Sequence, residues 1–232
     1  MKNIHMETIG KYKVGFTASW FSPYVKEIIG RLKAPDVLSE ETLGGRRKVD
    51  IFELAPGNRI VVKHYARGGI IGPLIKEIYF RWGKVRSQKE FEWLKKVRRL
   101  GIRAPEPIAF ISKGRLFYSC WLITGEIRRH RRLADIISED SSWYESIISD
   151  LTRQVNILIK NRVLHVDLHP GNVIIDNAGK PYIIDFDKAR IYAGSKNKLS
   201  RRYISRWRRA VIKHRLDPKL IPSFEMDLLP MA

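Results

Sequence analysis

Three oxygen-bearing side chains with a characteristic spacing are the strongest chemical signal in the sequence. Asp167 lies in the segment His165–Asn172, five residues before Asn172, and Asp185 follows Asn172 by thirteen residues. A carboxylate within hydrogen-bond reach of a hydroxyl can accept its proton. Magnesium prefers oxygen ligands and bridges phosphate groups. The spacing therefore predicts phosphoryl transfer, with Asp167 as the base and with Asn172 and Asp185 as metal ligands.

The same residues also have plainer interpretations. Asp167 could cap a turn, and Asp185 could form an Asx turn at the end of a strand. Both motifs occur in the expected order after a helix, which favours the chemical interpretation. We interpret His165 as a support for the loop backbone and not as a base. For His169, contact with phosphate or metal and simple packing in the loop remain equal alternatives.

A lysine and a glutamate in the first half of the chain form the second candidate group. Lys63 lies in the apolar strand pattern Ile60–Tyr65, where a charge is costly unless it is paired. Glu90 falls in the middle of the apolar face of the predicted helix Ser87–Leu100, whereas Glu92 falls on the opposite, basic face. We therefore predict that Glu90 pairs with Lys63 and that Lys63 contacts phosphate. The alternative is an edge-strand lysine that reaches solvent.

Two further segments occupy positions suited to a nucleotide. Gly44 and Gly45 precede the Lys63 strand, where a lid over the phosphates would lie, although a tight turn is the alternative. Ile123 and Gly125 fall where the chain passes between two expected lobes, and their backbone groups could contact an adenine. All four are expected to bind the nucleotide.

The elements that must position these residues divide the chain into two parts. Periodicity and turn residues predict a strand-rich first lobe over residues 1–124 with one helix, and a short, mainly helical second lobe over residues 125–232. Gly125 is the expected joint, and no element is predicted before Lys48. The fold class is α+β with two lobes. The predicted strands are Lys48–Leu54, Ile60–Tyr65, Ile108–Ser112, Leu116–Thr124, Val173–Ile175 and Tyr182–Ile184, and the helices are Ser87–Leu100, Trp143–Asn161 and Leu199–His214.

The charge is strongly positive and unevenly distributed. The 232 residues contain 44 Lys and Arg against 24 Asp and Glu, a net charge of +20. Residues 59–103 hold 13 basic and 3 acidic side chains, and residues 190–215 hold 10 basic side chains and none that is acidic. Such concentration predicts an anionic partner, namely nucleic acid, membrane lipid or a phosphorylated substrate. Solubility alone is the alternative.

Several classes of protein are disfavoured by composition. The single cysteine, Cys120, excludes an internal disulfide framework and a cysteine-based zinc cluster. No apolar run approaches the roughly 18 residues of a membrane-spanning helix, and no signal-peptide pattern follows Met1. The expectation is a soluble cytoplasmic protein that can lie on an anionic surface.

These residues together resemble the protein-kinase-like superfamily and, more narrowly, the lipopolysaccharide core kinases of Gram-negative bacteria. The resemblance extends from about Gly44 to Lys213. It rests on the catalytic-loop segment already described and on Val62–Gly69, Lys89–Phe91, Gly101–Pro107, Ile184–Arg190 and the Arg- and Trp-rich terminal helix.

The resemblance implies a two-lobed kinase-like fold that uses ATP and Mg²⁺. It implies transfer of phosphate to a sugar hydroxyl of 3-deoxy-D-manno-octulosonic acid (Kdo) attached to lipid A, on the cytoplasmic face of the inner membrane. Asp167 would be the base, Asn172 and Asp185 the metal ligands, and Lys63 with Glu90 the phosphate clamp. No nucleic acid partner is expected from it.

The identity of the acceptor remains open on the sequence. His169–Gly171 is also similar to aminoglycoside phosphotransferases and Rio-type kinases, and a heptose kinase of the lipopolysaccharide core is a close alternative. No Ala-Pro-Glu segment follows Asp185–Asp187, which favours a small or lipid-linked acceptor over a protein. A basic RNA-binding module is a non-enzymatic alternative, but it gives no role to the three oxygen-bearing residues.

Overall fold

A computed structural model describes residues 4–33, 49–55, 57–65, 79–80, 83–136, 141–226 and 228. The chain forms two compact units, and each is described by itself. The first unit comprises Met1–Glu92 and Glu106–Glu126, and the second comprises Trp93–Pro105 and Ile127–Ala232.

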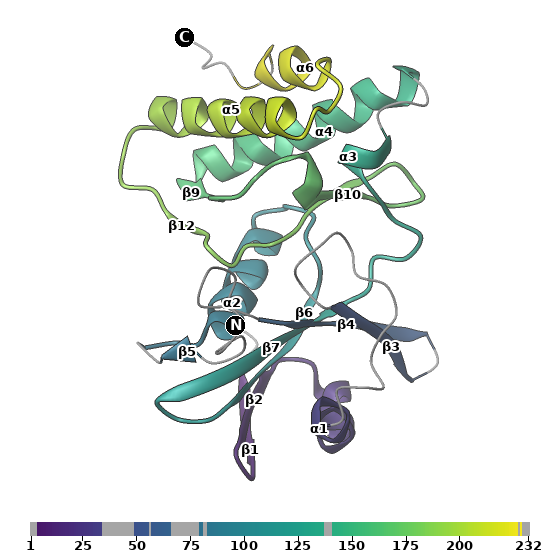
Figure 1. The fold of residues 1–232 in the computed structure, drawn as a ribbon, viewed down its shortest axis with the longest axis vertical. Helices are drawn as coiled ribbons and strands as arrows, with labels where there is room; N and C mark the ends of the chain where they lie inside the picture. The colour runs from purple at the N-terminus through teal and green to yellow at the C-terminus, as the bar shows by residue number, and fades with distance from the viewer. Residues whose placement is uncertain are drawn as a thin grey trace. The chain divides into compact units, whose positions relative to one another are not determined.

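An antiparallel sheet forms the centre of the first unit (Figure 1). Its strands run in the order β1-β2-β6-β7-β4-β3, and β5 pairs with β7. Alternation explains the burial of β4, in which Ile60 and Val62 are fully buried while Val61 between them is not. The strands are β1 (His5–Ile9), β2 (Tyr12–Phe16), β3 (Val49–Ala55), β4 (Asn58–His64), β5 (Tyr79–Phe80), β6 (Pro107–Lys113) and β7 (Phe117–Gly125).

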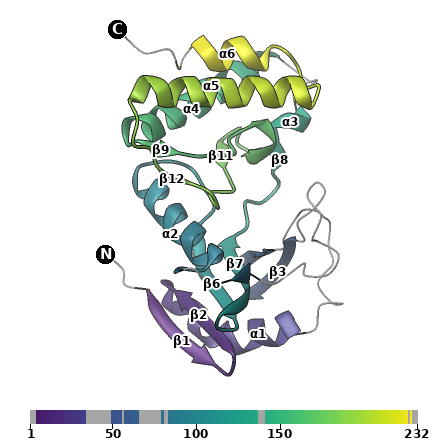
Figure 2. The same cartoon turned by 60° about the vertical axis from the view of Figure 1, so that its left-hand side comes forward.

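Helices cover both faces of this sheet (Figure 2). The 3-10 helix η1 (Ser19–Tyr24) and α1 (Val25–Lys33) bury Phe21, Val25 and Ile28 in one core cluster with strand residues that include Ile111. On the other face, the Phe91 ring of α2 (Arg86–Arg99) lies 5.2 Å from the ring of Phe110. Because consecutive strand residues point to opposite faces of a sheet, Phe110 packs on the α2 side and Ile111 packs on the side of η1 and α1.

Helices dominate the second unit, in which α4, α5 and α6 pack together (Figure 1). Trp207 of α5 stacks on Phe224 of α6 with ring centroids 4.1 Å apart, and its indole nitrogen donates to the Leu220 carbonyl at 2.8 Å. The helices are α3 (Leu133–Ile136), α4 (Ser141–Lys160), α5 (Lys196–Lys213), α6 (Leu220–Met226) and the 3-10 helix η3 (Pro170–Asn172), and the strands are β8 (Arg131–Arg132), β9 (Val163–Leu164), β10 (Val173–Ile175), β11 (Pro181–Ile183) and β12 (Arg190–Ile191).

The predicted α+β class is confirmed, with an antiparallel sheet in the first unit and mainly helices in the second. The division between units differs from a single joint at Gly125, because residues 93–105 belong to the second unit. Arg103 explains this assignment. Its carbonyl accepts from Ile183 N, its amide donates to Gln154 Oε1, and its guanidinium pairs with Asp150 at 2.7 Å.

Candidate functional site

Asp167 lies in the loop between β9 and η3, with both carboxylate oxygens engaged by cations. Arg206 donates to Oδ1 from 2.9 Å, and Lys188 Nζ donates to Oδ2 from 2.9 Å. The carboxylate remains 23% exposed. Asp167 is therefore held in place by two cations, and a hydroxyl can still approach it.

Asn172 connects the two parts of the predicted motif. Its side-chain nitrogen donates to the Asp167 carbonyl at 2.9 Å, and its own carbonyl accepts from Ile184 N at 3.0 Å. The antiparallel pairing of β10 with β11 places Val173 opposite Ile183. Asn172 and Asp185 therefore flank the open end of one hairpin, and Asp167 is joined to it through Asn172.

Asn172 and Asp185 offer a donor set that fits a hard cation. One supplies an amide oxygen, since its nitrogen already donates to the loop, and the other supplies a carboxylate. Magnesium is commonly held by one or two protein groups together with substrate phosphates and waters. Within the described ranges, no cluster of three or more His, Cys, Asp or Glu side chains could hold a metal ion by itself. The residues therefore suit a cation that arrives with phosphate.

Asp185 has an unusual backbone conformation. Its φ is +67°, in the left-handed region that only glycine adopts readily and that Asp and Asn tolerate better than other residues. Such a conformation costs about 1–3 kcal/mol when the surrounding structure imposes it. The hairpin and the turn after it thus impose the direction in which this carboxylate leaves the chain.

His165 supports the backbone, as its sequence position suggested. Its Nε2 donates to the Ile184 carbonyl at 2.9 Å, and its ring packs edge-on against Phe186 with centroids 4.6 Å apart. The side chain is fully buried, and burial lowers the pKa of the imidazole below its ordinary value. A neutral ring that donates to a carbonyl is a structural support for the residue preceding Asp185.

His169 has a local structural role. Its Nδ1 accepts a hydrogen bond from Gly171 N at 3.1 Å and thereby caps η3. Burial lowers the pKa of this histidine, and the nearby charges of Arg206 and His214 lower it further. The packing alternative for His169 therefore has direct support, and contact with phosphate stays a prediction.

Lys63 and Glu90 form the predicted ion pair inside the first unit. Lys63 Nζ lies 2.7 Å from Glu90 Oε2, and the two side chains are 15% and 3% exposed. The hydroxyl of Tyr65 also donates to Glu90, and the Lys63 ammonium lies 4.9 Å from the centre of the Tyr65 ring. Burying these charges is costly, and the hydrogen bonds offset that cost. The helix-face argument that chose Glu90 over Glu92 is thus confirmed, and Glu92 instead pairs with Lys84 at 2.7 Å.

The remaining nucleotide candidates have varied positions. Ile123 is fully buried in β7, opposite Val62 of β4 and Ala109 of β6. The Gly125 amide donates to the Glu106 carbonyl at 2.8 Å, so this donor is already used within the first unit. Contact of these backbones with adenine stays a prediction. Gly44 and Gly45 lie outside the described residues.

Sequence reasoning missed the cations that hold Asp167. Lys188 and Arg206 lie 21 and 39 residues after it, and no local pattern connects such distant positions. No role is predicted for the Tyr203 hydroxyl, yet it accepts from His165 N and donates to the Val163 carbonyl, each at 2.8 Å. The one available signal for the contacts of Tyr203 was its hydroxyl, a polar group on the apolar face of the helix.

Comparison with known proteins gives consistent results. Residues 37–217 match the model of the Lipopolysaccharide kinase (Kdo/WaaP) family. Proteins named 3-deoxy-D-manno-octulosonic acid kinase are similar to this chain. The protein from Vibrio cholerae serotype O1 is 34% identical over 136 residues, and the alignment covers 57% of each chain. The protein from Vibrio vulnificus strain CMCP6 is 33% identical over 150 residues, which cover 62% of this chain and 61% of the relative.

A more distant relative extends the match. The protein of the same name from Xylella fastidiosa strain 9a5c is 27% identical over 179 residues, which cover 74% of this chain and 69% of the relative. The match spans about three fifths of the length of the Vibrio relatives. Because the family model covers most of the sequence, the chain belongs to the lipopolysaccharide kinase (Kdo/WaaP) family.

Proposed function

We propose that this protein is an ATP- and Mg²⁺-dependent kinase that transfers the γ-phosphate to a sugar hydroxyl of Kdo in the lipopolysaccharide inner core. The observation that carries the proposal is the linked set Asp167, Asn172 and Asp185. A base and two oxygen donors for a cation are joined by backbone and side-chain hydrogen bonds at one end of a hairpin. Kinases of the protein-kinase type use this combination for phosphoryl transfer.

Each candidate site residue of the second unit has a defined role in the proposed reaction. Asp167 orients the acceptor hydroxyl and takes its proton as the oxygen attacks the γ-phosphorus, while the bond from phosphorus to the ADP oxygen breaks. Asn172 and Asp185 would hold Mg²⁺, which when bound neutralises phosphate charge. Lys188 and Arg206 hold the Asp167 carboxylate in its orientation.

The first unit supplies the proposed phosphate clamp. Lys63 would contact ATP phosphates, and Glu90 with Tyr65 would hold its ammonium in place. Names of the relatives support Kdo as the acceptor.

Radiolabelled ATP and purified Kdo-lipid A test the proposal directly. We expect label in the lipid with wild-type protein and Mg²⁺, and none when the metal is chelated. Asp167→Asn should lower turnover by about 10²–10⁴-fold, since a positioned base contributes that much. Its affinity for ATP, measured by titration calorimetry, should change by less than about threefold because the clamp is intact.

Asp176→Asn is a matched control, because Asp176 is a half-buried turn carboxylate in the same unit, and asparagine keeps the oxygen that accepts from Ala178 N and Lys180 N. It should leave turnover within about twofold. Label that appears only in heptosylated acceptors, or only in protein, would refute Kdo as the acceptor. Unchanged turnover in Asp167→Asn would refute the assignment of the base.

A further inference from the structure

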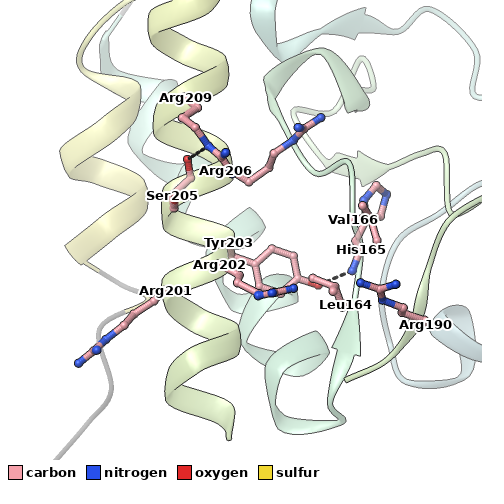
Figure 3. Close-up of a pocket in the computed structure, with 10 residues that line it drawn as sticks. All are labelled: Leu164, His165, Val166, Arg190, Arg201, Arg202, Tyr203, Ser205, Arg206 and Arg209. Carbon is pink, nitrogen blue, oxygen red and sulfur yellow. Dashed lines mark hydrogen bonds between the residues drawn. The ribbon is translucent and has the colours of Figure 1, made fainter. Parts of the chain in front are cut away.

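A cavity of about 450 Å³ lies beside α5 in the second unit and is lined by five arginines (Figure 3). Arg190 comes from β12, and the others come from α5. The backbone segment 164–166, immediately before Asp167, forms the facing wall. The arginines are Arg190, Arg201, Arg202, Arg206 and Arg209.

The positive charge of this cavity is hardly compensated. No carboxylate lines it among the described residues. Within the same ranges, Arg206 forms an ion pair and the other four lining arginines do not. The Nε atom of Arg206 is buried without a hydrogen-bond partner. Arg202 lies 5.4 Å from the Tyr192 ring, a contact that leaves its charge unneutralised. Planar guanidinium groups gathered in this way suit carboxylate and phosphate oxygens.

The cavity adjoins the catalytic carboxylate. Arg206 both lines it and donates to Asp167 Oδ1 at 2.9 Å. Figure 3 shows Arg190, Arg202 and Arg206 extending into the space between α5 and the 164–166 segment, while Arg201 points away. An anion that contacts Arg206 in this cavity would therefore share that arginine with the Asp167 carboxylate.

We propose that this cavity binds an anionic group of the phosphoryl acceptor, the carboxylate of the sugar acid or a phosphate attached nearby, and so selects an acidic sugar over a neutral one. The inference rests on the proposed function and deepens it. Arg190 and Arg202 are the specificity-determining residues, and the bound anion positions a neighbouring hydroxyl at Asp167.

The test compares wild-type protein with Arg190→Gln/Arg202→Gln. We expect the apparent KM for Kdo-lipid A to rise about tenfold or more, as loss of charge-assisted hydrogen bonds implies. The kcat at saturating acceptor should also fall, because the anion no longer positions the hydroxyl at Asp167, whereas the KM for ATP should stay within about twofold. The matched control is Lys198→Gln/Lys213→Gln, which removes the same charge from exposed positions of α5 outside the cavity. It should leave all three constants within about twofold.

Titration calorimetry gives a second measurement that does not depend on catalysis. Free Kdo should bind the wild-type protein and the lysine control, but bind the arginine variant more weakly. The methyl ester of Kdo, in which the carboxylate is neutral, and inorganic phosphate identify which anion is recognised. Absence of phosphate transfer from wild-type protein would defeat the proposed function, while this titration would still decide whether the cavity binds an anion.

Three results would overturn the inference. The arginine variant could match wild type in acceptor KM and in Kdo binding. Both variants could weaken equally, which would assign the effect to overall charge. The arginine variant could also lose binding to phosphatidylglycerol vesicles while binding Kdo normally, which would assign the cavity to a lipid headgroup. Circular dichroism and thermal unfolding verify that each variant is folded.

Discussion

At the scale of single residues, the site depends on side chains whose polar atoms are satisfied by distant parts of the second unit. Asp167 is held by Lys188 and Arg206, which approach its two oxygens separately. His165 is held by the Ile184 carbonyl and packs against Phe186. The candidate base and the candidate metal ligand Asp185 are therefore positioned through neighbours that do not themselves react.

The buried His165 predicts a pH dependence of stability. Burial lowers its pKa in the folded protein, whereas the unfolded chain has the ordinary value of about 6.5. Below that pH the unfolded state binds a proton that the folded state does not. The free energy of unfolding therefore decreases as the pH is lowered. The contribution of one histidine is at most about 1.4 kcal/mol per pH unit.

Urea unfolding between pH 8 and pH 5 measures this effect. His165→Gln keeps a donor in place of Nε2 and does not titrate, so we expect a shallower loss of stability on acidification. His169 retains its own share of the slope, since its pKa is also lowered. A variant with the same pH slope as wild type would show that His165 does not contribute.

At the scale of elements, periodicity and capping residues predict the helices more completely than they predict the contacts of the candidate site. The helix predicted over Ser87–Leu100 is Arg86–Arg99, and it ends in a motif in which Gly101 has φ +87° and Ile102 N donates to the Val97 carbonyl. Helix α5 begins three residues before the predicted Leu199, because Ser195 caps it through Lys198 N. Apolar spacing detects the buried face but not a polar first turn.

Other features were beyond local reasoning. No element is predicted between His5 and Lys33, although this segment forms two strands and two helices whose burial depends on residues of β4, β6 and β7. Glu90 was predicted because a charge on an apolar face needs a partner. Arg206 gave no such signal, since basic residues surround it on α5.

Helix α5 has two faces with separate roles. Leu199, Tyr203, Trp207 and Val211, which follow one another at intervals of four residues, are buried. Seven of its basic residues are exposed, namely Lys196, Lys198, Arg201, Arg202, Arg208, Arg209 and Lys213. The aromatic face therefore belongs to the core, and contact of the basic face with an anionic surface stays a prediction.

Tyr203→Phe tests how α5 supports the loop. The change removes a buried hydroxyl that accepts from His165 N and donates to the Val163 carbonyl. Leaving both groups unsatisfied should lower the free energy of unfolding by about 1–3 kcal/mol. Tyr182→Phe is the control, because its half-buried hydroxyl makes no hydrogen bond within the described chain. Equal stabilities of the two variants in urea would contradict the supporting role.

At the scale of the whole molecule, the net charge of +20 is the dominant feature. Among the described residues, no helix is both long and apolar enough to cross a bilayer. We propose that the protein reaches a lipid-linked acceptor by electrostatic attachment to the anionic cytoplasmic surface of the inner membrane. Clustered basic residues are attracted to anionic lipid headgroups.

Flotation with lipid vesicles tests that attachment. The protein should bind vesicles that contain phosphatidylglycerol and not vesicles of phosphatidylcholine alone. Binding should fall steeply between 0.05 and 0.5 M NaCl, about the range in which the Debye length shortens from more than 10 Å to a few ångströms. Equal binding to both lipids, or insensitivity to salt, would contradict an electrostatic mechanism.

The left-handed backbone at Asp185 has a practical consequence for anyone wishing to dissect this site. Asparagine tolerates the same φ and has the same shape, so Asp185→Asn subtracts one unit of charge while the chain keeps its path. An alanine at this position would be strained at positive φ, so the loss of the carboxylate could not be separated from a change in the turn. A glycine would increase the conformational freedom of the turn. The amide is therefore the informative replacement here, and a deficit it causes in metal titrations can be ascribed to the missing charge.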